Sequence, residues 1–186
     1  MQGKGRVAAA ALTAVLATGC QAAEEPAAFG RDAVRAEIRT VVAEAGMPES
    51  KLPGPGEETG TASPATDRER VARRAAACSA GWQYIGPVAD GARGKYDKAL
   101  TGLARAGWKE SGKRFEQPVG EKGGDTMVQV AFKKEGWTLY ARHNPSRALG
   151  ADILSFIAAE DVCMGQFTEQ ETALLSGDEP REESGH

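Results

Sequence analysis

Histidine is scarce in this chain of 186 residues, and its scarcity limits the chemistry available. The two histidines are His143 and His186, so a histidine-rich metal site is excluded and a Ser-His-Asp arrangement could use His143 alone. No serine lies in a G-x-S-x-G elbow, and residues 91–95 (GARGK) lack the spacing of a phosphate-binding loop. We therefore expect no catalytic residue, no metal, no cofactor and no enzymatic activity.

Long hydrophobic runs are also missing. The uncharged run at residues 7–17 (VAAAALTAVLA) is far short of the roughly twenty residues that span a membrane. Lys4 and Arg6 precede this run and the small residues Thr18 and Gly19 follow it, which is the order of a secretory signal peptide. We predict that residues 1–19 are a signal peptide that is removed on export.

Residues 16–20 (LATGC) end this signal and resemble the lipobox of bacterial lipoproteins, whose cysteine is acylated and becomes the new N-terminus. Ala17 stands where that pattern prefers leucine, so an ordinary signal peptide with Cys20 left as a free thiol is the alternative. With 14 Arg against 9 Lys in addition, the chain resembles small actinobacterial lipoproteins. The resemblance implies a lipid such as palmitate on Cys20 and a place on the extracytoplasmic side of the cell membrane, or secretion without the lipid.

Basic residues do not dominate the remaining chain. Without residues 1–19 it has 21 basic and 26 acidic side chains, a net charge near −5. That charge is too acidic for a general nucleic-acid binder, which needs a basic face. We expect the partners to be the membrane, through the lipid anchor, and an envelope protein or cell-wall component, with no nucleic acid.

Cysteine occurs three times. If a lipid occupies Cys20, then Cys78 and Cys163 remain, and an exported domain usually bridges such a pair. A redox pair or a metal site is the alternative, but neither a C-x-x-C motif nor a neighbouring histidine accompanies these cysteines. We predict a structural disulfide between Cys78 and Cys163.

The first part of the exported chain is predicted to hold one helix between flexible segments. Residues 20–30 are short and polar, as a tether should be. Residues 31–47 place valine and isoleucine at helical spacing, and their mixed charges favour packing on protein over packing on a membrane. Residues 48–74 combine a stretch rich in Pro, Gly and Glu with a charged lead-in, which predicts a flexible linker.

The compact domain is predicted at residues 75–175. Its expected strands are 75–88, 108–116, a hairpin of 126–133 and 137–142, and 153–160; its expected helices are 90–107 and a short one after Thr168. Loops are expected at 117–125 and 143–152, and a disordered acidic tail at 176–186. The fold class is therefore α+β: an antiparallel sheet of about four to five strands, with one or two helices on one face and one disulfide.

The aromatic residues are the remaining candidates for a site. Those spread over the predicted strands either line a ligand groove or fill the core, and the core is the expected place. The candidates are Trp82, Tyr84, Trp108, Trp137 and Tyr140. We expect a non-enzymatic binding or accessory role at the cell envelope. One alternative is a small-molecule binding or sensing domain with an aromatic-lined pocket, and a third is an envelope hydrolase that uses His143.

Overall fold

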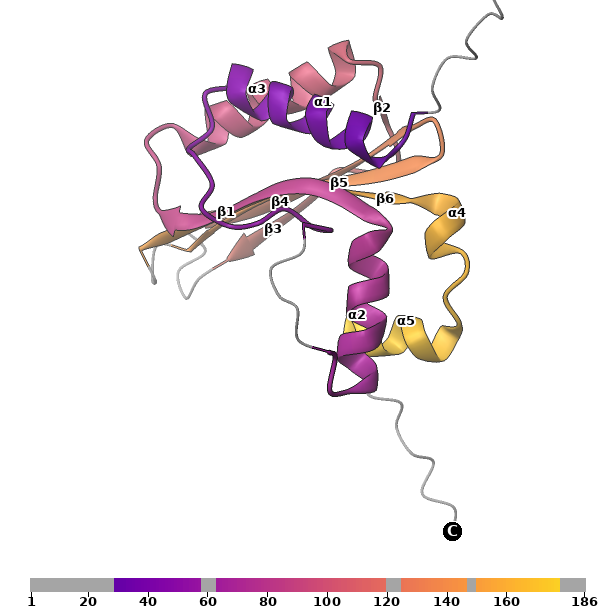
Figure 1. The fold of residues 1–186 in the computed structure, drawn as a ribbon. Coiled ribbons are helices and arrows are strands. Elements are labelled where there is room, and N and C mark those ends of the chain that lie inside the picture. Colours follow the sequence, from indigo (N-terminus) through magenta and orange to yellow (C-terminus); the bar gives the residue numbers. More distant parts are fainter. Residues whose placement is uncertain (1–28, 58–62, 120–124, 147–149, 178–186) are drawn as a thin grey trace, which may run out of the picture.

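A computed structural model describes residues 29–57, 63–119, 125–146 and 150–177, and the structural statements that follow concern these residues (Figure 1). They form five helices and a six-stranded antiparallel sheet. The predictions for residues 1–28, which include Cys20, and for the tail beyond residue 177 lie outside the described residues.

The sheet is built from long central strands and short outer ones. The order is β1-β6-β5-β4-β2, and β3 pairs with β4 beside β2. The strands are β1 (Ser79–Pro87), β2 (Lys109–Glu110), β3 (Phe115–Val119), β4 (Asp125–Lys134), β5 (Trp137–Ser146) and β6 (Ala151–Glu160). The α+β class is confirmed, but the sheet exceeds four or five strands. The strand expected at 108–116 is interrupted near Gly112, which has a φ of +83°, and becomes β2 and the start of β3.

Two helices cover one face of this sheet. The helices α1 (Arg31–Glu44) and α3 (Ala92–Arg105) lie side by side over it (Figure 1). The helices α2 (Asp67–Ala77), α4 (Asp161–Met164) and α5 (Glu169–Ser176) gather near the end of the sheet where β1 begins, and α2 packs against α5. Thr168 and Glu171 form the capping box predicted at the start of α5.

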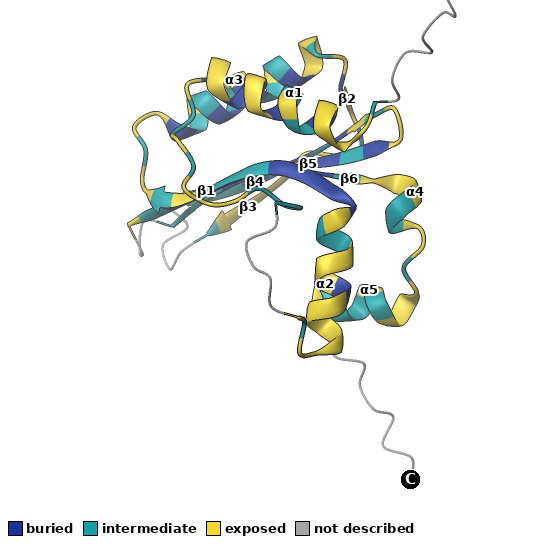
Figure 2. Cartoon of the chain, in the orientation of Figure 1, coloured by how far each residue is buried: buried dark blue, intermediate teal, exposed yellow. Residues whose placement is uncertain are grey.

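The core lies between the sheet and the pair α1 and α3. Alternate residues of the central strands, such as Phe156 and Leu139, are fully buried there, together with Ile38 of α1 and Leu103 of α3. Exposed residues remain on the outer sides of both helices (Figure 2). The helix expected at 31–47 thus packs on protein, and the core includes residues that precede the expected domain start at 75.

The segment predicted as a linker is attached to the sheet where it is described. The Ser50 hydroxyl donates to the carbonyl of Gln83, and the Gln83 amide donates to the Pro53 carbonyl over 3.1 Å. A Cβ atom on Gly54 would lie 2.7 Å from the Gly81 carbonyl oxygen, so glycine permits this close approach. Residues 48–57 therefore follow the edge of β1, and the charged lead-in forms α2.

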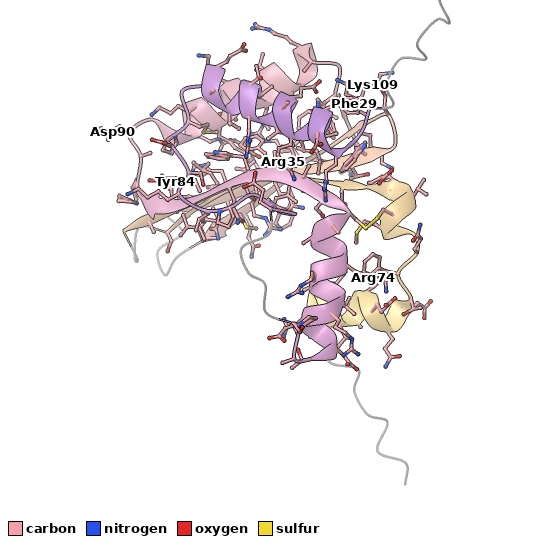
Figure 3. All side chains as sticks on the ribbon, viewed as in Figure 1. Phe29, Arg35, Arg74, Tyr84, Asp90 and Lys109 are labelled. Carbon is pink, nitrogen blue, oxygen red and sulfur yellow. A yellow bond between two sulfur atoms is a disulfide. The ribbon has the colours of Figure 1, made fainter. Side chains whose placement is uncertain are left out.

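The predicted disulfide is confirmed. Cys78, at the junction of α2 and β1, is bonded to Cys163 of α4, with their Cα atoms 5.7 Å apart (Figure 3). The Glu160 N–H also donates to the Cys78 carbonyl over 3.0 Å. The bridge therefore fastens the C-terminal helices to the start of β1.

Candidate functional site

The described structure places His143 and Asp152 in neighbouring strands. The expected loop at 143–152 is wrong for most of its length, since β5 runs to Ser146 and β6 begins at Ala151. Pro145 lacks an N–H, but it lies past the last β4–β5 pair, Val128 with His143, and needs no donor on that side. In the pairing of β5 with β6, His143 lies opposite Leu154, and Pro145 lies opposite Asp152. His143 and Asp152 therefore share a sheet face with the buried Leu154, which is the face that α1 and α3 cover.

His143 is buried without a hydrogen bond. Its side chain is 6% exposed and that of Asp152 is 1% exposed, with 3.5 Å between His143 Nε2 and Asp152 Oδ1. Neither ring nitrogen of His143 has a hydrogen-bond partner, and the ring packs against Tyr96 with 5.7 Å between centroids. An unsatisfied buried polar group costs about 1 to 3 kcal/mol, so the surrounding fold must offset this cost.

The charge state of His143 follows from its surroundings. Burial lowers the pKa of His143 below its ordinary value of 6.5, and the carboxylate of Asp152 opposes this shift. The imidazole is therefore neutral at pH 7, with one nitrogen able to donate and the other able to accept. Asp152 in turn accepts the Ala89 N–H through Oδ2 over 3.0 Å, which secures the loop between β1 and α3.

A pocket of about 440 Å³ opens beside His143 and Asp152. The loop before α3 and the start of that helix form one wall, from Val88 to Arg93, and Asp125, Thr126 and Pro145 complete the lining. Asp90, labelled in Figure 3, lies on this loop at the end of the sheet away from α2. Polar and apolar groups share the pocket wall about equally, and His143 belongs to its lining.

A second hollow, of about 470 Å³, lies between α1, residues 47–57 and β1. Trp82 lines it together with Val42 and Leu52, and an ion pair joins Arg39 to Glu57 at the same place. Among the five aromatic candidates, Trp82 and Tyr84 are brought together: their rings are stacked with 6.4 Å between centroids.

The other aromatic candidates lie elsewhere. Trp108 and Trp137 are 2% and 3% exposed in the core, where their indole N–H groups donate to Glu37 and to the Phe29 carbonyl respectively. Trp137 also borders a hollow at the β4–β5 turn. Tyr140 is 48% exposed and alternates onto the sheet face away from α1 and α3. The five residues therefore do not line one common pocket.

Sequence reasoning missed Asp152, although a signal was present. Asp152 continues the period-two series of Leu154, Phe156 and Ala158, which are all fully buried. His143 likewise continues the series of Leu139 and Ala141. A charged residue in register with a buried series indicates a polar group held inside the fold.

Neither a metal site nor a membrane span is found in the described part of the chain. There, no group of three or more His, Cys, Asp or Glu residues could hold a metal ion. No helix among the described residues is long and apolar enough to cross a membrane. Comparison of the chain with protein-family models, with curated proteins and with solved structures found no match.

Proposed function

We propose that this chain is a lipid-anchored protein on the extracytoplasmic side of the cell membrane, with a binding or accessory role rather than an enzymatic one. The disulfide between Cys78 and Cys163 supports export, because disulfides persist in oxidising compartments. The bridge uses two of the three cysteines, which leaves Cys20 for a lipid. Residues 21–30 span at most about 36 Å when fully extended, so the anchor would keep α1 close to the membrane.

The observation that carries the binding role is the pocket beside His143. A buried imidazole without a hydrogen-bond partner, next to a hollow of about 440 Å³, has bonding capacity that a ligand can use. This arrangement favours a small polar molecule. It differs from the aromatic-lined pocket of the alternative prediction, because no Trp or Tyr belongs to the lining.

The hydrolase alternative requires a nucleophile beside His143. Thr126 lines the same pocket, but no hydroxyl or thiol of the described residues is hydrogen-bonded to the imidazole. This geometry supports binding over hydrolysis. That the chain is not an enzyme stays a prediction, and a turnover abolished by His143→Gln would contradict it.

The anchor is tested by cell fractionation of the wild type and a Cys20→Ser variant. We expect the wild type in the membrane fraction after a high-salt wash and the variant released in soluble form, because a lipid anchor does not depend on charge. The Cys78→Ser, Cys163→Ser double variant is the control, since it removes the other two cysteines and keeps the anchor. A soluble wild type, or a variant that stays in the membrane fraction, contradicts the proposal.

A further inference from the structure

We propose that the pocket beside His143 binds the primary ammonium group of a small organic molecule. The inference rests on the binding role proposed above and names the chemistry of the ligand. The pocket measures about 440 Å³ and lies between the loop that follows β1, the start of α3 and the adjoining ends of β4, β5 and β6. Two features of its wall point to a cation: an excess of carboxylates, and an imidazole acceptor that lacks a donor.

Carboxylates outnumber cations in the pocket wall. Three of them line it: Asp90, Asp125 and Asp152. The guanidinium of Arg93 lines it too, but its Nε lies 3.1 Å from Asp97 Oδ2 and its Nη2 lies 3.5 Å from Glu116 Oε1. The start of α3 adds about half a positive charge, which still leaves an excess of negative charge. A cation in the pocket is therefore attracted.

His143 is the independent observation that points to a ligand. Its side chain is 6% exposed and lines the pocket, yet neither ring nitrogen has a hydrogen-bond partner. Nε2 lies 3.5 Å from Asp152 Oδ1, so the proton of the neutral ring belongs on Nε2, and Nδ1 is an acceptor. Because both nitrogens are closed off from solvent, bulk water does not supply the missing donor. An N–H group brought by a ligand would supply it.

An ammonium group fits these features better than a metal ion does. Among the described residues, no group of three or more His, Cys, Asp or Glu side chains could hold a metal ion. A primary ammonium group carries one positive charge and three N–H donors, so it can pair with a carboxylate and donate to a neutral imidazole at the same time. The volume of about 440 Å³ exceeds what this group fills, so the rest of the ligand is organic.

The carboxylates have different roles in this arrangement. Asp152 is 1% exposed and already accepts a backbone N–H of the loop before α3, so it acts on a ligand through its charge and through His143. Asp90 is exposed on that loop and is the direct partner of the ammonium group (Figure 3). Val88 and Pro145 give an apolar part of the wall to the carbon chain of the ligand. A small aliphatic amine matches this wall.

The test is an NMR titration of the ¹⁵N-labelled protein with methylammonium chloride at constant ionic strength. Sodium acetate, acetamide and magnesium chloride are titrated separately. We expect saturable shifts of the Asp90 and Gly91 amides with methylammonium, at a dissociation constant on the order of 10 mM. Tetramethylammonium has the same charge but no N–H, so it should bind about fivefold more weakly or worse.

Variants at Asp90 separate a site from a general effect of charge. Asp90→Asn removes the proposed partner and should weaken methylammonium binding about threefold or more, whereas Asp90→Glu keeps the charge and should change it less than about twofold. Glu44→Gln is the matched control, because it removes one negative charge from an exposed residue at the end of α1, outside the pocket lining. It should also change binding less than about twofold. Equal weakening by Asp90→Asn and Glu44→Gln contradicts the proposal.

The imidazole reports directly on the ligand. The chain contains two histidines, so a His186→Gln variant identifies the ring signals of His143. A bound ammonium group disfavours the imidazolium, so saturating methylammonium should lower the measured pKa of His143 further below 6.5. The charged and titratable groups that face the ring are Asp152 from β6 and Arg93, Tyr96 and Asp97 from α3. An unchanged pKa of His143 at saturation contradicts the proposal.

Three further outcomes overturn the inference: shifts that do not saturate, tetramethylammonium that binds as tightly as methylammonium, or saturable binding of magnesium with none of methylammonium. Saturable binding of acetamide or acetate alone keeps the binding role proposed above and removes this inference, so the two failures are distinguishable. Cell fractionation tests the lipid anchor independently of either.

Discussion

At the scale of single residues, His143 is a buried base that resists protonation in the native state. Burial lowers its pKa below the ordinary 6.5, whereas in the unfolded chain the ring takes up a proton near that value. The unfolded state therefore binds more protons as the pH falls through this range, and the free energy of unfolding decreases.

We predict that wild-type stability declines between pH 7.5 and pH 5.5 and that a His143→Gln variant lacks this part of the decline. Urea unfolding at several pH values measures it. The carboxylates with lowered pKa values, Glu69 and Glu171, lose their contribution below their ordinary 4.5, outside this window. Parallel pH profiles for the two proteins would show that His143 is not the group responsible.

Tyr96 ties α3 to the sheet through one hydrogen bond. Its hydroxyl donates to the Ala141 carbonyl over 2.9 Å, and the side chain is fully buried, which raises the pKa of Tyr96. We predict that Tyr96→Phe lowers the free energy of unfolding by about 1 kcal/mol, because the bond is lost inside the core. Tyr140→Phe, at an exposed tyrosine, is the control and should change it by less than about 0.5 kcal/mol. Equal losses of unfolding free energy for Tyr96→Phe and Tyr140→Phe in denaturant titrations would contradict a stabilising bond from Tyr96 to Ala141.

At the scale of elements, α1 belongs to the core although the sequence predicts a flexible linker at residues 48–74, between this helix and the compact domain. Ile38, a residue of this helix, is fully buried against the sheet. We predict that Ile38→Ala lowers the free energy of unfolding by about 2 to 5 kcal/mol, the usual loss for a buried isoleucine. Thr40→Ala, on the exposed side of α1, should cost less than about 0.5 kcal/mol. A small Ile38→Ala effect would mean that α1 does not pack on the sheet in solution.

The disulfide joins elements 85 residues apart in the chain. On the chain-entropy model, a closed loop of that length stabilises the fold by about 4 to 5 kcal/mol. We predict that reduction of the wild type lowers the urea concentration at the unfolding midpoint, because this stabilisation is lost. The Cys78→Ser, Cys163→Ser double variant should have the midpoint of the reduced wild type and should not respond to reductant. A wild type insensitive to reduction would contradict a bridge with a stabilising role.

The elements with strong local patterns could be predicted from the sequence, and those that depend on partners could not. Alternation predicted the β4–β5 hairpin, and helical spacing predicted α1 and α3. The extension of β5 through Pro145 was missed because proline is acceptable there only where the β4–β5 pairing has ended, at His143. The site was missed for a similar reason: His143 and Asp152 meet through strand register and lie under α3, and neither fact is visible in a local stretch.

At the scale of the whole molecule, the proposed lipid at Cys20 would tether a folded α+β domain. The anchor would lie on the α1 side, since α1 is the first described helix, while the His143 pocket lies at the start of α3. We expect the pocket to work independently of the anchor, because the groups that form it all come from the folded domain.

Intact mass spectrometry tests whether this chain is an exported, disulfide-closed domain with a lipid on Cys20. The protein is purified from membranes of its native host and measured with and without reduction and alkylation. We predict a chain that begins at Cys20, carries the mass of a diacylglyceryl group and gains two alkylated thiols only after reduction. An unlipidated chain, or free thiols at Cys78 and Cys163 before reduction, would contradict the claim.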